Sequence, residues 1–151
     1  MTMKPYIFLS GNYLRNTQDE NGNALDVRTL SNAPIDYQQT IFFTDIYGNI
    51  VNHSVDTLSL LNTNIVNMTV EASDGLGNYT TIFNLSGNAQ SNVFIKNANA
   101  VNTSSLRITI PDDTYNPQYV NAQIGVYGFV CNLCALTDSQ YKIEANEGSY
   151  R

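Results

Sequence analysis

The feature that most constrains this fold is the alternation of apolar and polar residues, with a period of two, between Val55 and Asp74. The segment reads VDTLSLLNTNIVNMTVEASD, and Met68, Val70 and Ala72 alternate in it with polar residues. This period places apolar side chains on one face of a β-strand. The Asn-Thr-Asn break and the later Asp-Gly pair favour turns. The segment therefore predicts two antiparallel strands of a sheet with one buried face.

The same pattern recurs at intervals of roughly 8–12 residues, which is typical of a β-sandwich. We expect about eight strands, at residues 6–14, 39–47, 55–61, 65–73, 79–85, 93–96, 105–110 and 122–130, with 25–30 as a short strand or turn. Residues 16–23 and 32–34 are expected to be loops. Gly125 and Gly128 are expected to let the last strand curve, and a bulge or a close approach of the backbone is the alternative. No window has helical spacing, and the sequence shows no linker or internal repeat. These features predict an all-β antiparallel β-sandwich of the jelly-roll type, a single domain over residues 1–151.

Charge excludes two classes of partner. The chain has 7 Lys and Arg against 13 Asp and Glu, a net charge of -6, and its cations are scattered. Nucleic acid and anionic membrane surfaces both need clustered cations, so neither is expected as a partner. No apolar stretch is long enough for a signal peptide or a membrane span, so we expect synthesis in the cytoplasm. The polar ending EANEGSYR suggests the N-terminal part of a longer chain.

The sequence contains no recognisable catalytic constellation. His53 is the only histidine, and it lies in a segment expected to be a polar surface turn. There is no GxSxG motif, and the neighbouring acidic pairs fall in predicted loops, where solvated carboxylates are expected. We therefore expect the chain not to be an enzyme.

Two short motifs offer metal or redox chemistry. Asp19, Asn21 and Asn23 present alternating oxygen atoms around Gly22, as a calcium loop does, and a solvated loop is the alternative. Cys131 and Cys134 form a Cys-x-x-Cys pair. Two reduced thiols, a redox pair and half of a zinc site are all compatible with that spacing. No other cofactor is expected.

Aromatic and basic residues near predicted loops are candidates for sugar binding. Aromatic faces stack on apolar surfaces, and arginine donates hydrogen bonds to hydroxyl groups. The candidates are Tyr13, Arg15, Tyr47, Tyr115 and Tyr119. The alternative is that these tyrosines pack on strand ends or on a neighbouring subunit.

Four segments between residues 55 and 130 carry, in order, a resemblance to a known family. They read VDTLSLLNTNI, MTVEASDGLGNYTTIFNL, SLRITI and NAQIGVYGFV. Their order resembles that of the galactose-binding-like domains, which include discoidin and coagulation-factor type C domains. Members usually carry tryptophan, whereas this chain has none and places Tyr79 after the Asp-Gly turn. The resemblance implies a jelly roll that binds ligands through loops at one end, often with a structural calcium ion.

Domains that resemble this family occur in phage tail and fibre proteins. We therefore predict a non-enzymatic structural or interaction module of a larger assembly, an adhesion or decoration protein of a phage virion or tail. Its expected partners are other virion proteins and further copies of the chain in a homo-oligomer, and its expected location is the virion. The alternative is a carbohydrate-binding module that recognises host glycans, with or without calcium.

Overall fold

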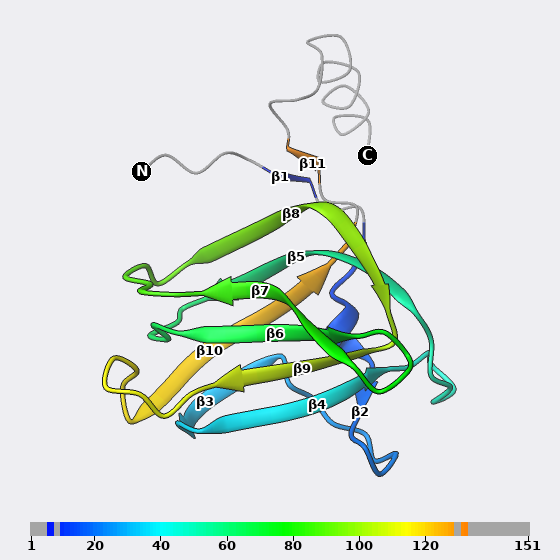
Figure 1. Ribbon diagram of the computed structural model, residues 1–151, viewed down its shortest axis with the longest axis horizontal. Helices are drawn as coiled ribbons and strands as arrows, with labels where there is room; N and C mark the ends of the chain where they lie inside the picture. The colour runs from blue at the N-terminus through cyan, green and yellow to red at the C-terminus, as the bar shows by residue number, and fades with distance from the viewer. Residues whose placement is uncertain (1–5, 8–9, 129–130, 133–151) are drawn as a thin grey trace, which may run out of the picture.

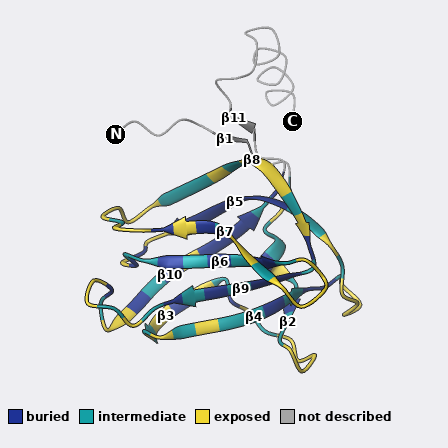
Figure 2. Cartoon of the chain, viewed as in Figure 1, coloured by how far each residue is buried: buried dark blue, intermediate teal, exposed yellow. Residues whose placement is uncertain are grey.

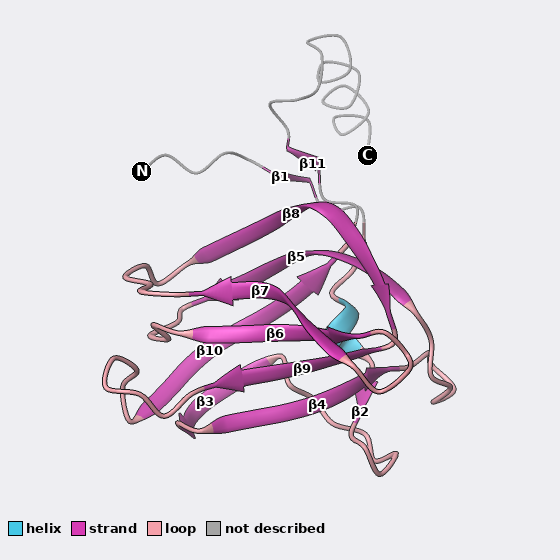
Figure 3. Ribbon diagram, viewed as in Figure 1, coloured by secondary structure: helices cyan, strands magenta, loops and turns pink. Residues whose placement is uncertain are grey.

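The computed structural model describes residues 6–7, 10–128 and 131–132, and their regular structure is almost entirely β (Figure 1, Figure 3). Within these residues the helical structure is one 3-10 turn, η1 (Tyr13–Arg15). Two strands of two residues each, β1 (Tyr6–Ile7) and β11 (Cys131–Asn132), pair antiparallel and join segments far apart in sequence. The described residues contain no helix with the length and apolar character of a membrane span.

Two antiparallel sheets face each other, and within the described residues they hold nine strands. The four-stranded sheet has the order β3 (Thr29–Pro34), β10 (Tyr119–Tyr127), β5 (His53–Leu61), β8 (Val93–Thr103). The five-stranded sheet has the order β2 (Thr17–Gln18), β4 (Tyr37–Phe43), β9 (Ser105–Ile110), β6 (Met68–Ser73), β7 (Tyr79–Leu85). The predicted all-β antiparallel sandwich is confirmed.

Alternating side chains fill the space between the sheets, as the sequence predicts. In β9, Leu106, Ile108 and Ile110 are fully buried. In β6, Met68, Val70 and Ala72 are buried, whereas the residues between them are partly exposed. Burial of each such side chain contributes about 1.5–3 kcal/mol. Figure 2 shows the exposed residues gathered in the loops and along β7 and β8.

Polar side chains connect the two sheets along one side. The Asn97 amide of β8 donates to the Ile82 carbonyl oxygen of β7 at 2.8 Å. Ser104 alone separates β8 from β9, so the chain changes sheets at one residue. The Thr103 hydroxyl of β8 donates across to the Ser73 carbonyl oxygen of β6 at 2.8 Å, and within the five-stranded sheet the Ser105 hydroxyl donates to the Ile41 carbonyl oxygen at 2.8 Å. Thr103 and Ser105 are both buried, so these bonds satisfy the polar side chains at the corner between β8 and β9.

The connections gather at two ends of the sandwich (Figure 1). One end, called here the η1 end, contains residues 10–16, 19–23, 44–52 and 74–78. The opposite end, called here the Asn116 end, contains residues 35–36, 62–67, 86–92 and 111–118. The two ends position every loop-borne candidate residue of the sequence.

Several strand boundaries differ from the prediction. The strands predicted at 79–85 and 105–110 are confirmed. Of the described residues in the strand predicted at 6–14, Tyr6–Ile7 are β, whereas residues 10–14 are not, because the Asn12 side chain caps η1 by accepting from the Leu14 amide at 3.1 Å. The strand predicted at 39–47 ends at Phe43, where a turn begins. The prediction of a loop at 32–34 is wrong, since these residues end β3 and Pro34 is tolerated at the end of an edge strand.

Further strand boundaries also differ from the prediction. The loop expected at 16–23 contains β2, the strand expected at 93–96 continues to Thr103, and the one expected at 65–73 begins at Met68. The strand expected at 122–130 spans Tyr119–Tyr127 instead, and residues 129–130 lie outside the described residues. Cys131 lies in β11, and Cys134 is outside the described residues.

The two glycines near the end of β10 allow close packing, which is the alternative expected from the sequence. A Cβ atom on Gly128 would lie 2.0 Å from the Ser54 carbonyl oxygen. A Cβ atom on Gly125 would lie 2.5 Å from the Tyr127 ring. The register shift of β10 falls elsewhere, between Val120 and Ala122.

Candidate functional site

A cleft of about 420 Å³ opens at the η1 end. This volume lies within the range of small-ligand sites, roughly 300–1,000 Å³. Its walls come from two segments far apart in sequence: Gly11, Asn12, Tyr13, Arg15 and Asn16 from the first, and Thr44, Asp45, Ile46, Val51 and His53 from the second. A second hollow of about 430 Å³ shares Arg15, Asn16 and residues 44–46 with it. Residue Arg15 therefore stands between two concave surfaces.

Asn12 fixes the first wall of the cleft. Its side-chain oxygen accepts from the amide of Leu14 at 3.1 Å and from the amide of Val126 at 3.0 Å. Its side-chain amide donates to the Ile124 carbonyl oxygen at 3.1 Å. Leu14 is fully buried in the core. The 3-10 turn is thus attached to β10 through Asn12 and to the core through Leu14. These two attachments hold Tyr13 and Arg15, the first and last residues of the turn, in place.

An aromatic stack forms the inner part of the cleft. The Tyr13 and His53 rings are parallel within 4° at a centroid distance of 4.1 Å. Both rings also make edge contacts with the buried Phe43, at 5.9 Å for Tyr13 and 5.1 Å for His53. Because His53 covers one face of Tyr13, the tyrosine acts mainly as the support of the imidazole.

His53 was predicted to be a surface residue in a polar turn, and this prediction is wrong. It is the first residue of β5, pairs with Thr103, and is half-buried against two aromatic rings. Burial lowers the pKa of its imidazole, since desolvation disfavours the charged form. The ring is therefore neutral at pH 7, with one nitrogen that donates and one that accepts a hydrogen bond.

Arg15 supplies a cation without a carboxylate partner. Two other described arginines are ion-paired, Arg28 with Asp26 at 2.8 Å and Arg107 with Glu71 at 2.6 Å. Among the described residues Arg15 makes no ion pair, and its side chain is solvent-exposed. A guanidinium held on a short, clamped turn keeps its donors available to hydroxyl or carboxylate oxygens.

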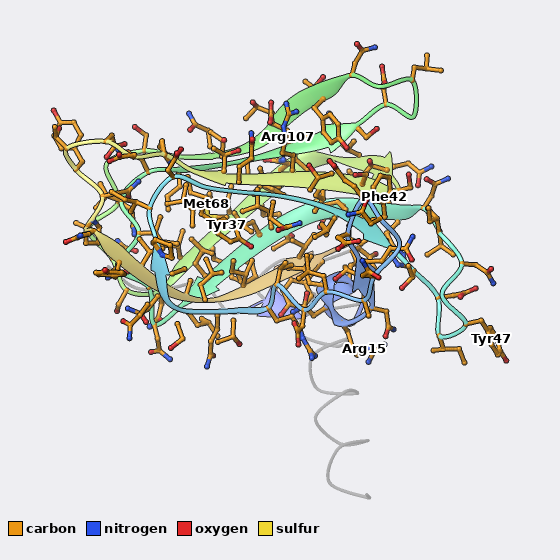
Figure 4. All side chains as sticks on the ribbon, turned by 90° about the horizontal axis from the view of Figure 1, so that it is seen from below. Arg15, Tyr37, Phe42, Tyr47, Met68 and Arg107 are labelled. Carbon is orange, nitrogen blue, oxygen red and sulfur yellow. The ribbon has the colours of Figure 1, made fainter. Side chains whose placement is uncertain are left out.

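The loop between β4 and β5 forms the outer wall and carries exposed apolar residues. Ile46 is 80% exposed and Tyr47 is 83% exposed. Figure 4 shows Tyr47 at the tip of this loop, on the side of the molecule where Arg15 lies. The loop is ordered by Asp45, whose Oδ1 accepts from the amides of Tyr47 and Asn49, both at 2.9 Å. These bonds lower the pKa of Asp45, the bond from the Asn49 amide most of all.

The same turn occurs three times at the η1 end, each with the sequence Asp-x-x-Gly-Asn. The three copies are Asp19–Asn23, Asp45–Asn49 and Asp74–Asn78. In each, the aspartate Oδ1 accepts from the amides two and four residues later, and its own amide donates to the carbonyl oxygen of the asparagine. The glycine has a positive φ of 82°, 86° and 95° respectively, which favours glycine. The spacing was visible in the sequence, but the prediction considered each turn separately.

This turn accounts for the spacing that indicated calcium. Calcium takes about six to eight oxygen ligands. Asp19 Oδ1 instead accepts from the amides of Asn21 and Asn23, both at 2.9 Å, as in the two turns for which no metal was predicted. Within the described residues no group of three or more His, Cys, Asp or Glu side chains is arranged to hold a metal. Calcium at Asp19, Asn21 and Asn23 stays a prediction, and the described geometry does not call for it.

The structure divides the five predicted sugar-binding residues between the two ends. Tyr13, Arg15 and Tyr47 belong to the η1 end, whereas Tyr115 and Tyr119 belong to the Asn116 end. Tyr119 begins β10, whereas Asn12 bonds to Ile124 and Val126 near the end of the same strand. The five residues therefore cannot form one site.

Comparison with solved structures finds carbohydrate-binding modules that are similar to this chain. A family 32 module of Clostridium perfringens, CpGH89CBM32-5 in complex with GalNAc-β-1,3-galactose, aligns with a TM-score of 0.53 and 11% identity over 79% of this chain and 100% of its own. The family 32 module of Streptococcus pneumoniae EndoD has a TM-score of 0.49 and 11% identity, over 82% of this chain and 96% of its own. Chitosan-binding module 2 of a Paenibacillus chitosanase/glucanase has a TM-score of 0.49 and 18% identity, over 83% of this chain and 96% of its own.

The first of these similarities shows that the fold is shared. It confirms the predicted galactose-binding-like β-sandwich at the level of architecture. No protein-family model matches the chain, and no curated protein matches it by sequence.

Proposed function

We propose that this protein is a non-catalytic carbohydrate-binding module, and that its glycan occupies the cleft at the η1 end. The observation that carries the proposal is the position of Arg15, a cation without an ion pair among the described residues, in the same cleft as the stacked Tyr13–His53 pair. The structural similarity to carbohydrate-binding modules supports this role at the level of fold.

Three residues that line the cleft, and Tyr47 at the adjoining loop tip, have chemical tasks in this proposal. The Arg15 guanidinium donates to ring or hydroxyl oxygens of the sugar, and the neutral His53 imidazole both donates and accepts. Tyr47 covers the apolar face of a sugar ring from the loop tip, with Ile46 beside it. Tyr13 positions His53 and does not itself stack on the ligand.

The experiment is a glycan array followed by titration calorimetry with the best ligand. Loss of a hydrogen bond to a charged group costs about 1.5–3 kcal/mol, so Arg15→Ala should weaken binding roughly 10- to 100-fold. Tyr47→Ala should weaken it about 3- to 10-fold through lost stacking. Lys96→Ala, an exposed cation on β8, and Leu76→Ala, at another turn of the same type, are the matched controls and should leave the Kd unchanged. If Arg15→Ala binds as tightly as the unaltered protein, the cleft is not the site.

An assembly role is a second proposal, and exposed apolar side chains favour it. Ile46, Tyr47 and Leu76 project from turns of the η1 end, and exposed apolar clusters commonly mark contacts with other proteins. In this role the chain is an adhesion or decoration module of a phage virion or tail, and it contacts other virion proteins or its own copies. Light scattering across a concentration series tests it, and a strict monomer at high concentration would count against self-assembly.

A further inference from the structure

The Asn116 end contains a second cleft, on the opposite side of the sandwich from Arg15. Its volume is about 410 Å³, and it is lined by Pro34, Ile35, Asp112, Gln118 and Tyr119. The first two residues come from the end of β3 and its turn, and the other three come from the 111–118 loop and the start of β10. The backbone joins these walls, since the Ile35 amide donates to the Gln118 carbonyl oxygen at 3.2 Å.

The loop that carries this cleft is held by Asn116, which is only 6% exposed. Its side-chain oxygen accepts from the amides of Val66 and Asn67 at 2.9 and 3.0 Å. Its side-chain amide donates to the carbonyl oxygens of Asn67 and Pro111, both at 3.0 Å. All four hydrogen-bonding positions of one buried amide are thereby used. The loop is fixed before any ligand arrives.

Asp113 adds a second clamp to the same loop. Its Oδ1 accepts from the amides of Tyr115 and Asn116 at 2.9 and 2.8 Å, and its Oδ2 accepts from the Asn67 side chain at 2.9 Å. These bonds lower the pKa of Asp113, the bond from the Asn116 amide most of all. The carboxylate is therefore charged and structurally committed, which leaves the neighbouring Asp112 as the exposed acid of the cleft.

Two tyrosine rings are exposed here, Tyr115 on this rigid loop and Tyr119 at the start of β10. Tyr115 is 74% exposed and Tyr119 is 53% exposed. Side-chain and loop ordering is a large cost of binding, and a loop that is already fixed avoids part of it. Tyr119 lies in the cleft with an amide (Gln118) and a carboxylate (Asp112) beside it. An aromatic ring with convergent polar groups is the composition that a sugar ring requires.

The charge of this cleft differs from that of the η1 end. Among its described lining residues none carries a positive charge, and Asp112 carries a negative one. A carboxylate accepts hydrogen bonds from hydroxyl groups and from an ammonium group, and it repels another carboxylate. The cleft therefore favours neutral and amino sugars over acidic ones.

We propose that the Asn116 end is a second saccharide site, which takes a neutral or amino sugar ring stacked on Tyr119. Strand β10 separates the two ends by eight residue steps, about 26 Å at roughly 3.3 Å per residue. One molecule would then hold two glycans at once and bridge separate chains. This site does not depend on the η1 cleft, so either site can fail while the other stands.

Nitrogen-proton correlation spectra of the whole chain test the proposal directly. The probes are oligomers of galactose, of glucosamine and of galacturonic acid, added separately. We expect the amides of residues 112–116, 118–120 and 35 to shift with the first two probes and not with the third. Tyr119→Ala should weaken these shifts about tenfold or more, and Asp112→Asn should weaken binding of the glucosamine oligomer more than that of the galactose oligomer. Tyr115→Ala tests whether the neighbouring ring contributes as well.

The location of the shifts separates the two proposals. Shifts at residues 11–16 and 44–53 that Arg15→Ala abolishes report the η1 cleft, and Tyr119→Ala should leave them unchanged. If every probe shifts only that set, the second site is refuted and the proposed function stands. If only the residues of the Asn116 end shift, the η1 cleft is refuted and the second site stands. Shifts that Tyr119→Ala does not affect would also refute the second site.

Discussion

Replacement of Asn116 by alanine is the most informative test of how the loops are held. The side chain is buried, and it makes four hydrogen bonds to the backbone. Three of them join Val66 and Asn67, about 50 positions earlier in sequence, and the fourth joins Pro111 in its own loop. Alanine removes the acceptor of two amides and the donor of two carbonyl groups. The lost bonds connect the 62–67 loop with the 111–118 loop, so no single loop can compensate alone.

The magnitude follows from the groups left without partners. A buried donor or acceptor without a partner costs about 1–3 kcal/mol, and water that enters a surface loop recovers part of that cost. With two amides and two carbonyl groups affected, we expect a loss of about 2–4 kcal/mol in the free energy of unfolding. For a domain of this size each 1 kcal/mol lowers Tm by about 2–4 °C, so Tm should fall by about 5–15 °C.

Urea denaturation followed by circular dichroism measures this loss, with two variants as references. Asn99→Ala removes an exposed asparagine of β8 and should cost less than about 0.5 kcal/mol. Asn116→Asp keeps the acceptor for the amides of Val66 and Asn67 but loses both donors, so it should fall between the two. An Asn116→Ala variant that loses less than about 1 kcal/mol would refute the view that this side chain holds the loops.

Two further predictions concern the η1 end. Gly128→Ala should lower the free energy of unfolding by about 1–3 kcal/mol in urea denaturation, because its Cβ would lie 2.0 Å from the Ser54 carbonyl oxygen. Gly125→Ala should lower it less, since its Cβ meets the movable side chains of Tyr127 and Ser59. Equal losses in the two variants would contradict this. The pKa of His53 is lower in the folded chain than in the unfolded one, so the unfolded chain takes up a proton first and stability should fall as pH drops below about 6.5. His53→Gln should remove that part of the pH profile, and an unchanged profile would contradict the assignment.

Much of the fold was predictable because apolar alternation is a local property of the sequence. The strands at 79–85 and 105–110 have the predicted bounds, and the inward residues of β9 are those expected. β8 was underestimated because its second half, from Asn97 onward, mixes polar residues with small apolar ones and is mostly exposed at a sheet edge, where no core imposes alternation. β3 was missed for the same reason, since it pairs on one side only and ends in proline.

The candidate site was less predictable because it depends on contacts between distant residues. His53 lies in a polar stretch, and its aromatic partner Tyr13 comes from a segment 40 positions away. The role of Asn116 likewise rests on bonds to residues 49 and 50 positions away. In a chain so rich in asparagine, local sequence does not distinguish a buried hub from a solvated loop residue. The division of the five predicted sugar-binding residues between two ends also follows only from the strand order.

The three Asp-x-x-Gly-Asn turns allow a structural role to be separated from a binding role. Asp45→Ala removes the acceptor for the amides of Tyr47 and Asn49, so hydrogen exchange at both amides should accelerate, and the loop tip should lose its fixed orientation. Asp74→Ala removes the same bonds at Leu76 and Asn78 in a turn that does not line the cleft.

If Tyr47 contacts the glycan, Asp45→Ala should weaken glycan binding, whereas Asp74→Ala should accelerate exchange in its own turn and leave the Kd unchanged. The two variants carry the same chemical change in the same motif, so a difference between them reports position alone. Equal effects on the Kd would show that these turns act through general stability, and exchange at Asn49 that does not change in Asp45→Ala would show that the aspartate does not order the loop.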